Sequence, residues 1–195
     1  MADERPWRLF LALPLPAEAA AAVVRALAPV RASFPDARWL TVETLHLTLV
    51  FLGSTRPGRV ADLARLVDAA AASHARFTVM TGLGGGREQP DGDGVAWLQL
   101  QRGGAETARL GARLEGEVAA VPGTGGGAAR APRRSPSAHL TVARHASREL
   151  IAALARGEPH VEPVTWVADR IVLFRSHLER SGAQYELMHV ASLGG

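Results

Sequence analysis

The sequence contains no cysteine and no lysine, and it has no long apolar run. The absence of cysteine excludes disulfide bonds, thiolate metal sites and cysteine nucleophiles. No apolar run approaches the ~20 residues that a membrane-spanning helix needs, so we expect no membrane span. All 22 basic residues are therefore arginine, and the net charge of +3 is too small to indicate a general nucleic-acid-binding surface.

What is present indicates a folded protein. The chain has 195 residues, of which 47% are hydrophobic, and this excludes wholesale disorder. The length fits one large domain or two small lobes, and no linker divides the sequence, so we expect a single domain over residues 1–195. We also expect a monomer. The apolar stretch near the N-terminus is interrupted by Pro14 and Pro16 and is unlike a signal peptide, which indicates a cytoplasmic protein.

Strand-like and helix-like stretches interleave along the chain. Helical spacing predicts helices over Ala17–Ser33, Val60–Ala72, Glu106–Val121 and Arg148–Leu154. Extended segments are predicted over Trp7–Leu13, Trp39–Val42, Leu45–Leu52, Phe77–Met80, Val95–Leu100, His139–Ala143, Val161–Val167, Arg170–Phe174 and Gln184–Val190. Tight βαβ spacing is not maintained, so the pattern predicts an α+β fold with helices packed on antiparallel sheets.

Two glycine-rich stretches, Gly84–Gly94 and Gly123–Pro136, are interpreted as loops. They are either flexible rims of a site or tolerated insertions, and the sequence leaves their role open.

One tripeptide occurs twice, as His46-Leu47-Thr48 and as His139-Leu140-Thr141. Each copy lies in a strand-like run, where side chains at i and i+2 share a face. Histidine and threonine would then line one face of each strand, and aliphatic residues would face the core. Two such strands, meeting across a pseudo-twofold axis, would bring together two imidazoles and two hydroxyl groups.

That set of groups is typical of acid–base chemistry on an anionic substrate. Imidazole titrates near neutral pH, so two histidines can serve as general base and general acid in one step. Hydroxyl groups can donate hydrogen bonds to non-bridging oxygens. A phosphodiester meets both conditions, because water attacks phosphorus while an alkoxide leaves.

Other interpretations of the histidines compete with this one. A single histidine on a strand is more often structural, but two copies in matching contexts are harder to explain in that way. A zinc site with two histidines lacks a third ligand in either motif. The remaining histidines have no comparable context and are interpreted as surface or packing residues: His74, His145, His160, His177 and His189.

With these motifs the sequence resembles the two-histidine (2H) phosphoesterases, whose mark is a pair of H-x-T/S-x motifs. Within them it is most similar to the LigT-like bacterial and archaeal RNA 2′,3′-cyclic phosphodiesterases, once described as 2′-5′ RNA ligases. The likeness covers nearly the whole chain, from Arg8–Leu13 through Leu45–Gly53 and His139–Arg144 to the closing run at 171–187. It implies two pseudo-symmetric lobes of antiparallel sheet, with outer helices, around a central cleft.

The resemblance also implies roles. The first histidine, His46, would protonate the departing 3′ oxygen, and His139 would activate water. Thr48 and Thr141 would hold the phosphate oxygens, and the product would be a 2′-phosphomonoester. Neither a metal nor a cofactor is implied.

Three more residues are candidates for substrate binding. Phe51 stands where the family places an aromatic residue that stacks on the terminal base. Arg144, five residues after His139, stands where an arginine can pair with phosphate, and Arg134, five residues before His139, is a further phosphate candidate. Strict alternation would turn Phe51 and Arg144 away from the histidines, so each needs a bulge or a strand end.

The resulting hypothesis is hydrolysis of RNA or nucleotide 2′,3′-cyclic phosphate ends without metal. The alternatives are another 2H phosphodiesterase acting on small cyclic nucleotides, a 2′-5′ RNA ligase, a nucleotide- or RNA-binding module without turnover, and a structural domain.

Overall fold

The computed structural model describes residues 5–88, 94–124, 138–179 and 182–194. Its helices are α1 (Ala17–Ala26), α2 (Ala28–Ser33), η1 (Pro57–Arg59), α3 (Val60–Ala72), α4 (Gly104–Ala119) and α5 (Arg148–Arg156). Its strands are β1 (Trp7–Pro14), β2 (Arg38–Trp39), β3 (His46–Thr55), β4 (Phe77–Arg87), β5 (Val95–Arg102), β6 (His139–Arg144), β7 (Thr165–Ala168), β8 (Arg170–Glu179) and β9 (Gly182–Ser192).

The strands form two antiparallel sheets. The first has the order β3-β1-β8-β9, and the second has the order β2-β6-β5-β4-β7. The sheets do not correspond to the two halves of the sequence, because β2 joins the second sheet and the last two strands return to the first. The predicted α+β class with two antiparallel sheets is confirmed.

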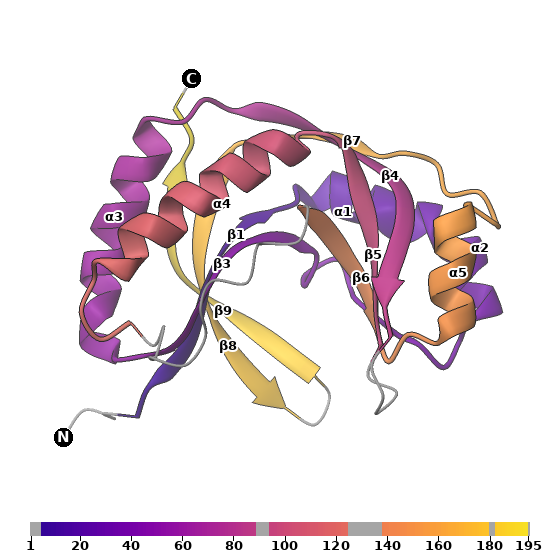
Figure 1. Ribbon diagram of the computed structural model, residues 1–195, viewed down its shortest axis with the longest axis horizontal. Helices are drawn as coiled ribbons and strands as arrows, with labels where there is room; N and C mark the ends of the chain where they lie inside the picture. The colour runs from indigo at the N-terminus through magenta and orange to yellow at the C-terminus, as the bar shows by residue number, and fades with distance from the viewer. Residues whose placement is uncertain (1–4, 89–93, 125–137, 180–181, 195) are drawn as a thin grey trace.

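Helices cover the outer faces of the sheets. In Figure 1, α3 and α4 lie beside the first sheet, where α4 contacts β3 and α3 contacts β8 and β9, while α5 lies against β4 and β5 of the second sheet. The stripe Leu110, Leu114 and Val118 of α4 is buried as its spacing predicts. Each leucine buried in this way contributes about 2 kcal/mol to folding. No helix among the described residues is long and apolar enough to cross a membrane.

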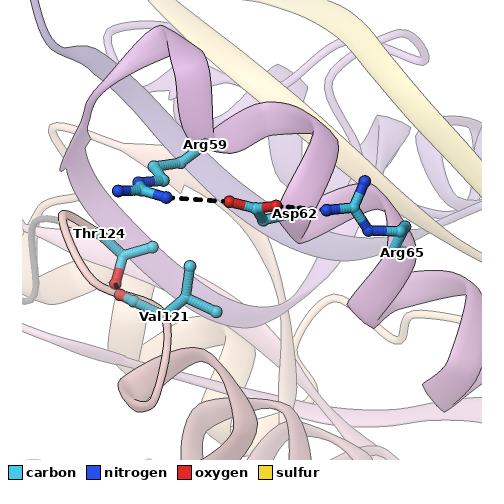
Figure 2. Close-up of polar contacts among 5 residues, drawn as sticks. All are labelled: Arg59, Asp62, Arg65, Val121 and Thr124. Atoms are coloured by element: carbon cyan, nitrogen blue, oxygen red, sulfur yellow. Dashed lines mark hydrogen bonds and ion pairs between the residues drawn. The ribbon is translucent and has the colours of Figure 1, made fainter.

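The start of α3 lies beside the end of α4 (Figure 2). Asp62, in the first turn of α3, accepts hydrogen bonds from Arg59 and Arg65. After α4, the hydroxyl of Thr124 donates to the carbonyl oxygen of Val121 at 2.9 Å and closes the turn. The backbone N–H of Arg56, just before η1, donates to the carbonyl oxygen of Gly123 at 3.4 Å and joins the two segments.

Two predictions about elements are wrong. The helix predicted over Ala17–Ser33 is two helices that meet at Leu27, because Pro29 at the start of α2 has no N–H to continue the hydrogen-bond ladder. Gly84–Gly86, predicted as part of a loop, belongs to β4 and pairs with Ala96–Leu98 of β5. Residues 89–93 of that predicted loop lie outside the described part of the chain.

The glycines of β4 have a packing reason. A Cβ at Gly84 would lie 2.5 Å from the Leu154 side chain, and one at Gly86 would lie 2.5 Å from Ile151. Both partners belong to α5, so glycine lets this helix approach the strand backbone closely. Other strand bounds also differ: the segment predicted over Val161–Val167 is a strand only over Thr165–Ala168, and β8 and β9 extend further than predicted.

The last described residues form hydrogen bonds to two connections in which the chain passes from one sheet to the other. Leu193 is buried, and its N–H donates to the carbonyl oxygen of Asp169, between β7 and β8. Gly194 donates to the carbonyl oxygen of Ala71 in α3 and accepts from the N–H of Arg76, just before β4. These bonds join the β3-to-β4 and β7-to-β8 passages between the two sheets.

Candidate active site

The two motif strands repeat each other in burial. In β3 and in β6 the first six residues alternate identically: half-buried, buried, half-buried, buried, buried, exposed. The histidine and threonine of each motif are the half-buried positions, while Leu47 and Leu140 are buried. Histidine and threonine therefore share one face of each strand, as their spacing predicts.

Both strands also carry an irregularity at the same place. In the β1–β3 pair, Thr48 and Val50 face consecutive residues of β1, so Leu49 is an extra residue. In the β5–β6 pair, Thr141 and Ala143 face consecutive residues of β5, and Val142 is the extra residue. An extra residue shifts the alternation of side chains by one.

This shift turns the fifth residue after each histidine onto the motif face. Phe51 is 75% exposed, and Arg144, the last residue of β6, is also exposed. The expectation that both need a bulge or a strand end is thereby met in their placement. Their roles toward a ligand stay predictions.

The two motif strands come together where the sheets meet. β3 is an edge strand of the first sheet, and β6 is paired on one side only by the short β2, through Arg144 and Ala143. The His139 end of β6 is thus not covered by β2, and β6 contacts β3. The seam between the sheets therefore carries both motifs.

Hydrogen bonds fix the tautomer of His46. Its Nδ1 lies 2.8 Å from the carbonyl oxygen of Thr44, and its Nε2 lies 3.1 Å from the hydroxyl oxygen of Thr48. Since a carbonyl can only accept, Nδ1 carries the proton and donates it to Thr44. In the neutral ring Nε2 is then an acceptor, and Thr48 donates to it.

Burial makes His46 hard to protonate. Desolvation, and to a lesser degree the positive charge of Arg144, lowers the pKa of His46 from its ordinary 6.5 to about 4, although the hydrogen bond to Thr44 acts in the opposite direction. His46 is therefore neutral at pH 7.

Aromatic rings surround both histidines. Phe10 of β1 and Tyr185 of β9 lie with ring centroids 5.0 and 5.2 Å from that of His46, and Trp97 of β5 lies 4.8 Å from His139. Burial raises the pKa of Tyr185, whereas the charges of Arg144 and Arg38 lower it. Tyr185 is thus close to both arginines as well as to His46.

Arg134, the remaining candidate, lies outside the described residues. Among the other histidines, His189 Nε2 lies 2.7 Å from a carboxylate oxygen of Asp68, and His177 Nε2 lies 2.8 Å from one of Glu186. Within the described ranges, no group of three or more His, Cys, Asp or Glu residues is arranged to hold a metal ion.

Known proteins share this arrangement. The family described as LigT-like phosphoesterase matches residues 13–85. An RNA 2′,3′-cyclic phosphodiesterase from Geobacillus stearothermophilus is 31% identical in an alignment of 191 residues that covers 95% of this chain. Escherichia coli LigT has the same fold with a TM-score of 0.71 at 23% identity, over 98% of this chain and 99% of that one. The chain is thus similar to the LigT-like phosphoesterases in sequence and in fold.

One further solved structure is also similar to this chain. The protein TT0787 of Thermus thermophilus is 29% identical, with a TM-score of 0.66 over 96% of this chain and 98% of that one. The chain spans 57% of the length of the Geobacillus relative. The predicted resemblance to this family is confirmed.

Sequence reasoning did not place Trp97, Phe10 or Tyr185 at the candidate site. Phe10 lies on β1 next to β3, and Trp97 is opposite Thr141, so strand pairing brings these two to the motifs. Tyr185 contacts His46 from β9, which does not pair with β3. For Trp97 the sequence signal was the alternation within Val95–Leu100, which marks a face but not its neighbour.

One cavity adjoins the first motif. It has a volume of about 380 Å³ and is lined by residues of β1, α1, β8 and β9: Pro14, Leu15, Pro16, Ala17, Arg170, Val172, Phe174, Leu187 and Val190. Pro14 is opposite His46 in the β1–β3 pair, and the ring of Phe174 lies 6.5 Å from that of His46. A second cavity, of about 460 Å³, lies between the end of α2 and α5, and neither motif lines it.

Proposed function

We propose that this protein opens 2′,3′-cyclic phosphate ends of RNA to 2′-phosphomonoesters by two-histidine acid–base catalysis. The observation that carries the proposal is the repeated motif: two strands at one seam, each with histidine and threonine on one face and a register shift after the threonine. A cyclic phosphodiester suits this site because one proton must be removed from water and one supplied to the leaving oxygen.

In the proposed reaction, His139 removes a proton from water as the water oxygen attacks phosphorus. The bond between phosphorus and the 3′ oxygen breaks, and His46 Nε2 gives its proton to that oxygen. The 2′ ester remains intact, and exchange with solvent restores both rings. The hydroxyls of Thr48 and Thr141 and the guanidinium of Arg144 would stabilise the charge on the non-bridging oxygens. Phe51 would stack on the terminal base.

The proposed acid must first gain a proton, because His46 is neutral at pH 7 in the free protein. A phosphate anion beside Nε2 favours the charged ring and raises its pKa. Protonation of Nε2 also ends its role as acceptor for Thr48, so the threonine hydroxyl becomes available to a phosphate oxygen. Protonation of His46 thus makes the ring an acid and frees the Thr48 hydroxyl for the phosphate.

The relatives support the choice of substrate class. The Geobacillus relative is an RNA 2′,3′-cyclic phosphodiesterase, and E. coli LigT forms complexes with phosphate and with 3′-AMP. We extend this to RNA or nucleotide 2′,3′-cyclic phosphate ends for the present chain. The expected monomer, single bilobal domain and cytoplasmic location stay predictions.

The test is a short RNA that ends in a 2′,3′-cyclic phosphate, incubated with the protein and excess chelator. Mass spectrometry and digestion identify the product and the position of its phosphate. Conversion to a 2′-phosphate supports the proposal, including its independence from metal. A 3′-phosphate would contradict the assigned direction of ring opening, and turnover that stops with chelator would contradict a metal-free reaction.

Matched variants test the assigned histidines. His46→Ala or His139→Ala should lower kcat by about 10²-fold or more, since each removes a proton-transfer group. His160→Ala, at an exposed histidine that pairs with Glu162, is the control and should keep the wild-type rate. A wild-type rate in either motif variant would contradict the mechanism.

The same assay separates the alternatives. Faster turnover of cyclic mononucleotides than of RNA would indicate another 2H phosphodiesterase. Joining to an RNA with a free 5′-hydroxyl would indicate the ligase. Binding of the cyclic end without conversion would indicate a binding module.

A further inference from the structure

Arg38 lies directly beside the candidate site, although no sequence motif drew attention to it. It is the first residue of β2 and stands opposite Arg144 in the antiparallel β2–β6 pair. Residues directly opposite each other in such a pair point to the same face of the sheet. Because the register shift places Arg144 on the His139 and Thr141 face, Arg38 belongs to that face too.

Two arginines opposite each other repel. Directly opposite side chains have Cβ atoms about 5 Å apart, where like charges destabilise a sheet. Both residues are exposed at the mouth of the seam. Two phosphate groups of one ligand, one against each guanidinium group, would offset this repulsion, and phosphate matches the guanidinium fork.

Arg38 also reaches the end of the β8–β9 hairpin. A side chain at Gly182, the first residue of β9, would collide with the guanidinium group of Arg38. Figure 1 shows this hairpin extending from the first sheet between the two sets of strands. Gly182 has a φ of +134°, a conformation in which glycine is strongly favoured, so the hairpin leaves room for the arginine.

Tyr185 connects the arginine to the first motif. Its ring lies edge-on to His46, and the charges of both Arg38 and Arg144 act on its hydroxyl group. Tyr185 thus lies beside His46 and within electrostatic range of both arginines. A ligand phosphate at the motifs would have Arg38 on its flank, beyond Arg144.

We infer that Arg38 binds the phosphodiester linkage on the 5′ side of the terminal nucleotide, and so makes the site prefer RNA ends over cyclic mononucleotides. This inference rests on the proposed function. Arg144 would serve the cyclic phosphate itself, whereas Arg38 serves the next phosphate along the chain. Arg38 is thus a specificity-determining residue that does not touch the reacting atoms.

Three substrates measure the contribution of a phosphate on the 5′ side of the terminal nucleotide. They are adenosine 2′,3′-cyclic phosphate, the same compound with a 5′-phosphate, and the dinucleotide ApA ending in a 2′,3′-cyclic phosphate. The wild-type protein should turn over the second and third with kcat/KM about ten-fold above the first, through KM, since one charge-assisted contact is worth that factor. Arg38→Gln should remove this advantage.

The controls address charge and folding. Arg102→Gln removes the same charge far from the site. Arg102 is the last residue of β5, whereas the first residue, Val95, is the one opposite Arg144. This variant should retain the preference. Arg38→Lys keeps the charge without the fork and should retain part of it. Circular dichroism and the thermal midpoint show whether each variant is folded.

Each outcome either supports or overturns the inference about Arg38. Equal wild-type values for all three substrates, or an equal loss on all three in a folded Arg38→Gln, would overturn the inference while the proposed function stands. If no substrate turns over, the proposed function fails. The inference about Arg38 is then tested by the calorimetric affinities of the protein for adenosine 2′-phosphate and for ApA 2′-phosphate. A preference for the dinucleotide that Arg38→Gln removes then supports the second-phosphate site, and equal affinities reject it.

Discussion

His46 keeps its Nδ1 proton on the carbonyl oxygen of Thr44, which leaves only Nε2 to exchange a proton with a ligand. The neutral ring results from burial among aromatic side chains, with Phe10 and Tyr185 closest, and from the charge of Arg144. The same surroundings that orient the ring therefore make protonation costly in the absence of an anion.

This cost predicts a dependence of stability on pH. The unfolded chain protonates His46 below about pH 6.5, whereas the folded protein does so only near pH 4. Acid therefore favours the unfolded state across that window. Wild-type protein should lose about 2 kcal/mol more unfolding free energy than His46→Ala between pH 7 and 4.5. Urea denaturation at several pH values measures this difference.

The control for this prediction is His160→Ala, because His160 is exposed. It should follow the wild-type curve. Parallel curves for wild type and His46→Ala would show that His46 titrates with the same pKa in the folded and unfolded states.

At this scale the sequence predicted the motif face but not its neighbours. The spacing of two between His46 and Thr48 is enough to place both on one face of a strand. The ring of Trp97 on His139 depends on the register of β5 against β6, which no local pattern encodes. Alternation alone would have placed Phe51 in the core, because it takes no account of the extra residue at Leu49.

The elements behind the motif strands hold the extra residue in place. Helix α4 presents Gly111 to the carbonyl oxygen of Leu49, and a Cβ on this glycine would lie 3.1 Å from that oxygen. The helix therefore contacts β3 at the residue that shifts the alternation. Gly116, one and a half turns further along the same helix, has no atom within 4 Å of such a Cβ.

The two glycines form a matched pair for mutation. Gly111→Val should lower the unfolding free energy by about 2 kcal/mol, because the added carbons press on backbone that cannot yield. Gly116→Val should change it by less than about 0.5 kcal/mol, since valine is no worse than glycine in a helix. Thermal or urea denaturation of both variants measures the difference. A similar loss at both positions would show that helix propensity, and not contact with β3, is responsible.

Elements with a clear hydrophobic period were predicted well, and glycine and proline account for the wrong predictions. Val60–Ala72 was predicted with the bounds that α3 has. Gly84–Gly86 was interpreted as loop because glycine is rare in strands, yet the approach of α5 requires it there. The break at Leu27 was missed because alanine-rich sequence continues on both sides of it.

For the whole molecule, the relative placement of the two sheets depends on segments far apart in sequence. Leu193 and Gly194 bond to Ala71, Arg76 and Asp169, which lie at two passages between the sheets. The pattern of elements predicted antiparallel sheets with helices packed on them, and the family resemblance implied two lobes. They could not assign β2 to the second sheet or β8 and β9 to the first, because only long-range pairing decides this.

Loss of the Leu193 side chain should therefore weaken the whole fold. Leu193 is 2% exposed, and Leu193→Ala should lower the unfolding free energy by about 3 kcal/mol through the lost burial and the cavity left behind. Leu187→Ala, at a leucine of β9 that is 59% exposed, should cost less than about 1 kcal/mol. Urea denaturation compares the two variants, and equal effects would show that burial of the Leu193 side chain adds nothing to stability.

The repeated strands β3 and β6 differ at the one exposed position that the extra residue turns toward the seam. There the first strand carries a phenyl ring, Phe51, and the second carries a guanidinium group, Arg144. A perfectly duplicated site would accept an asymmetric molecule in two opposite orientations with equal ease. A single difference, an apolar ring at one end and a cation at the other, is enough to give this site a polarity.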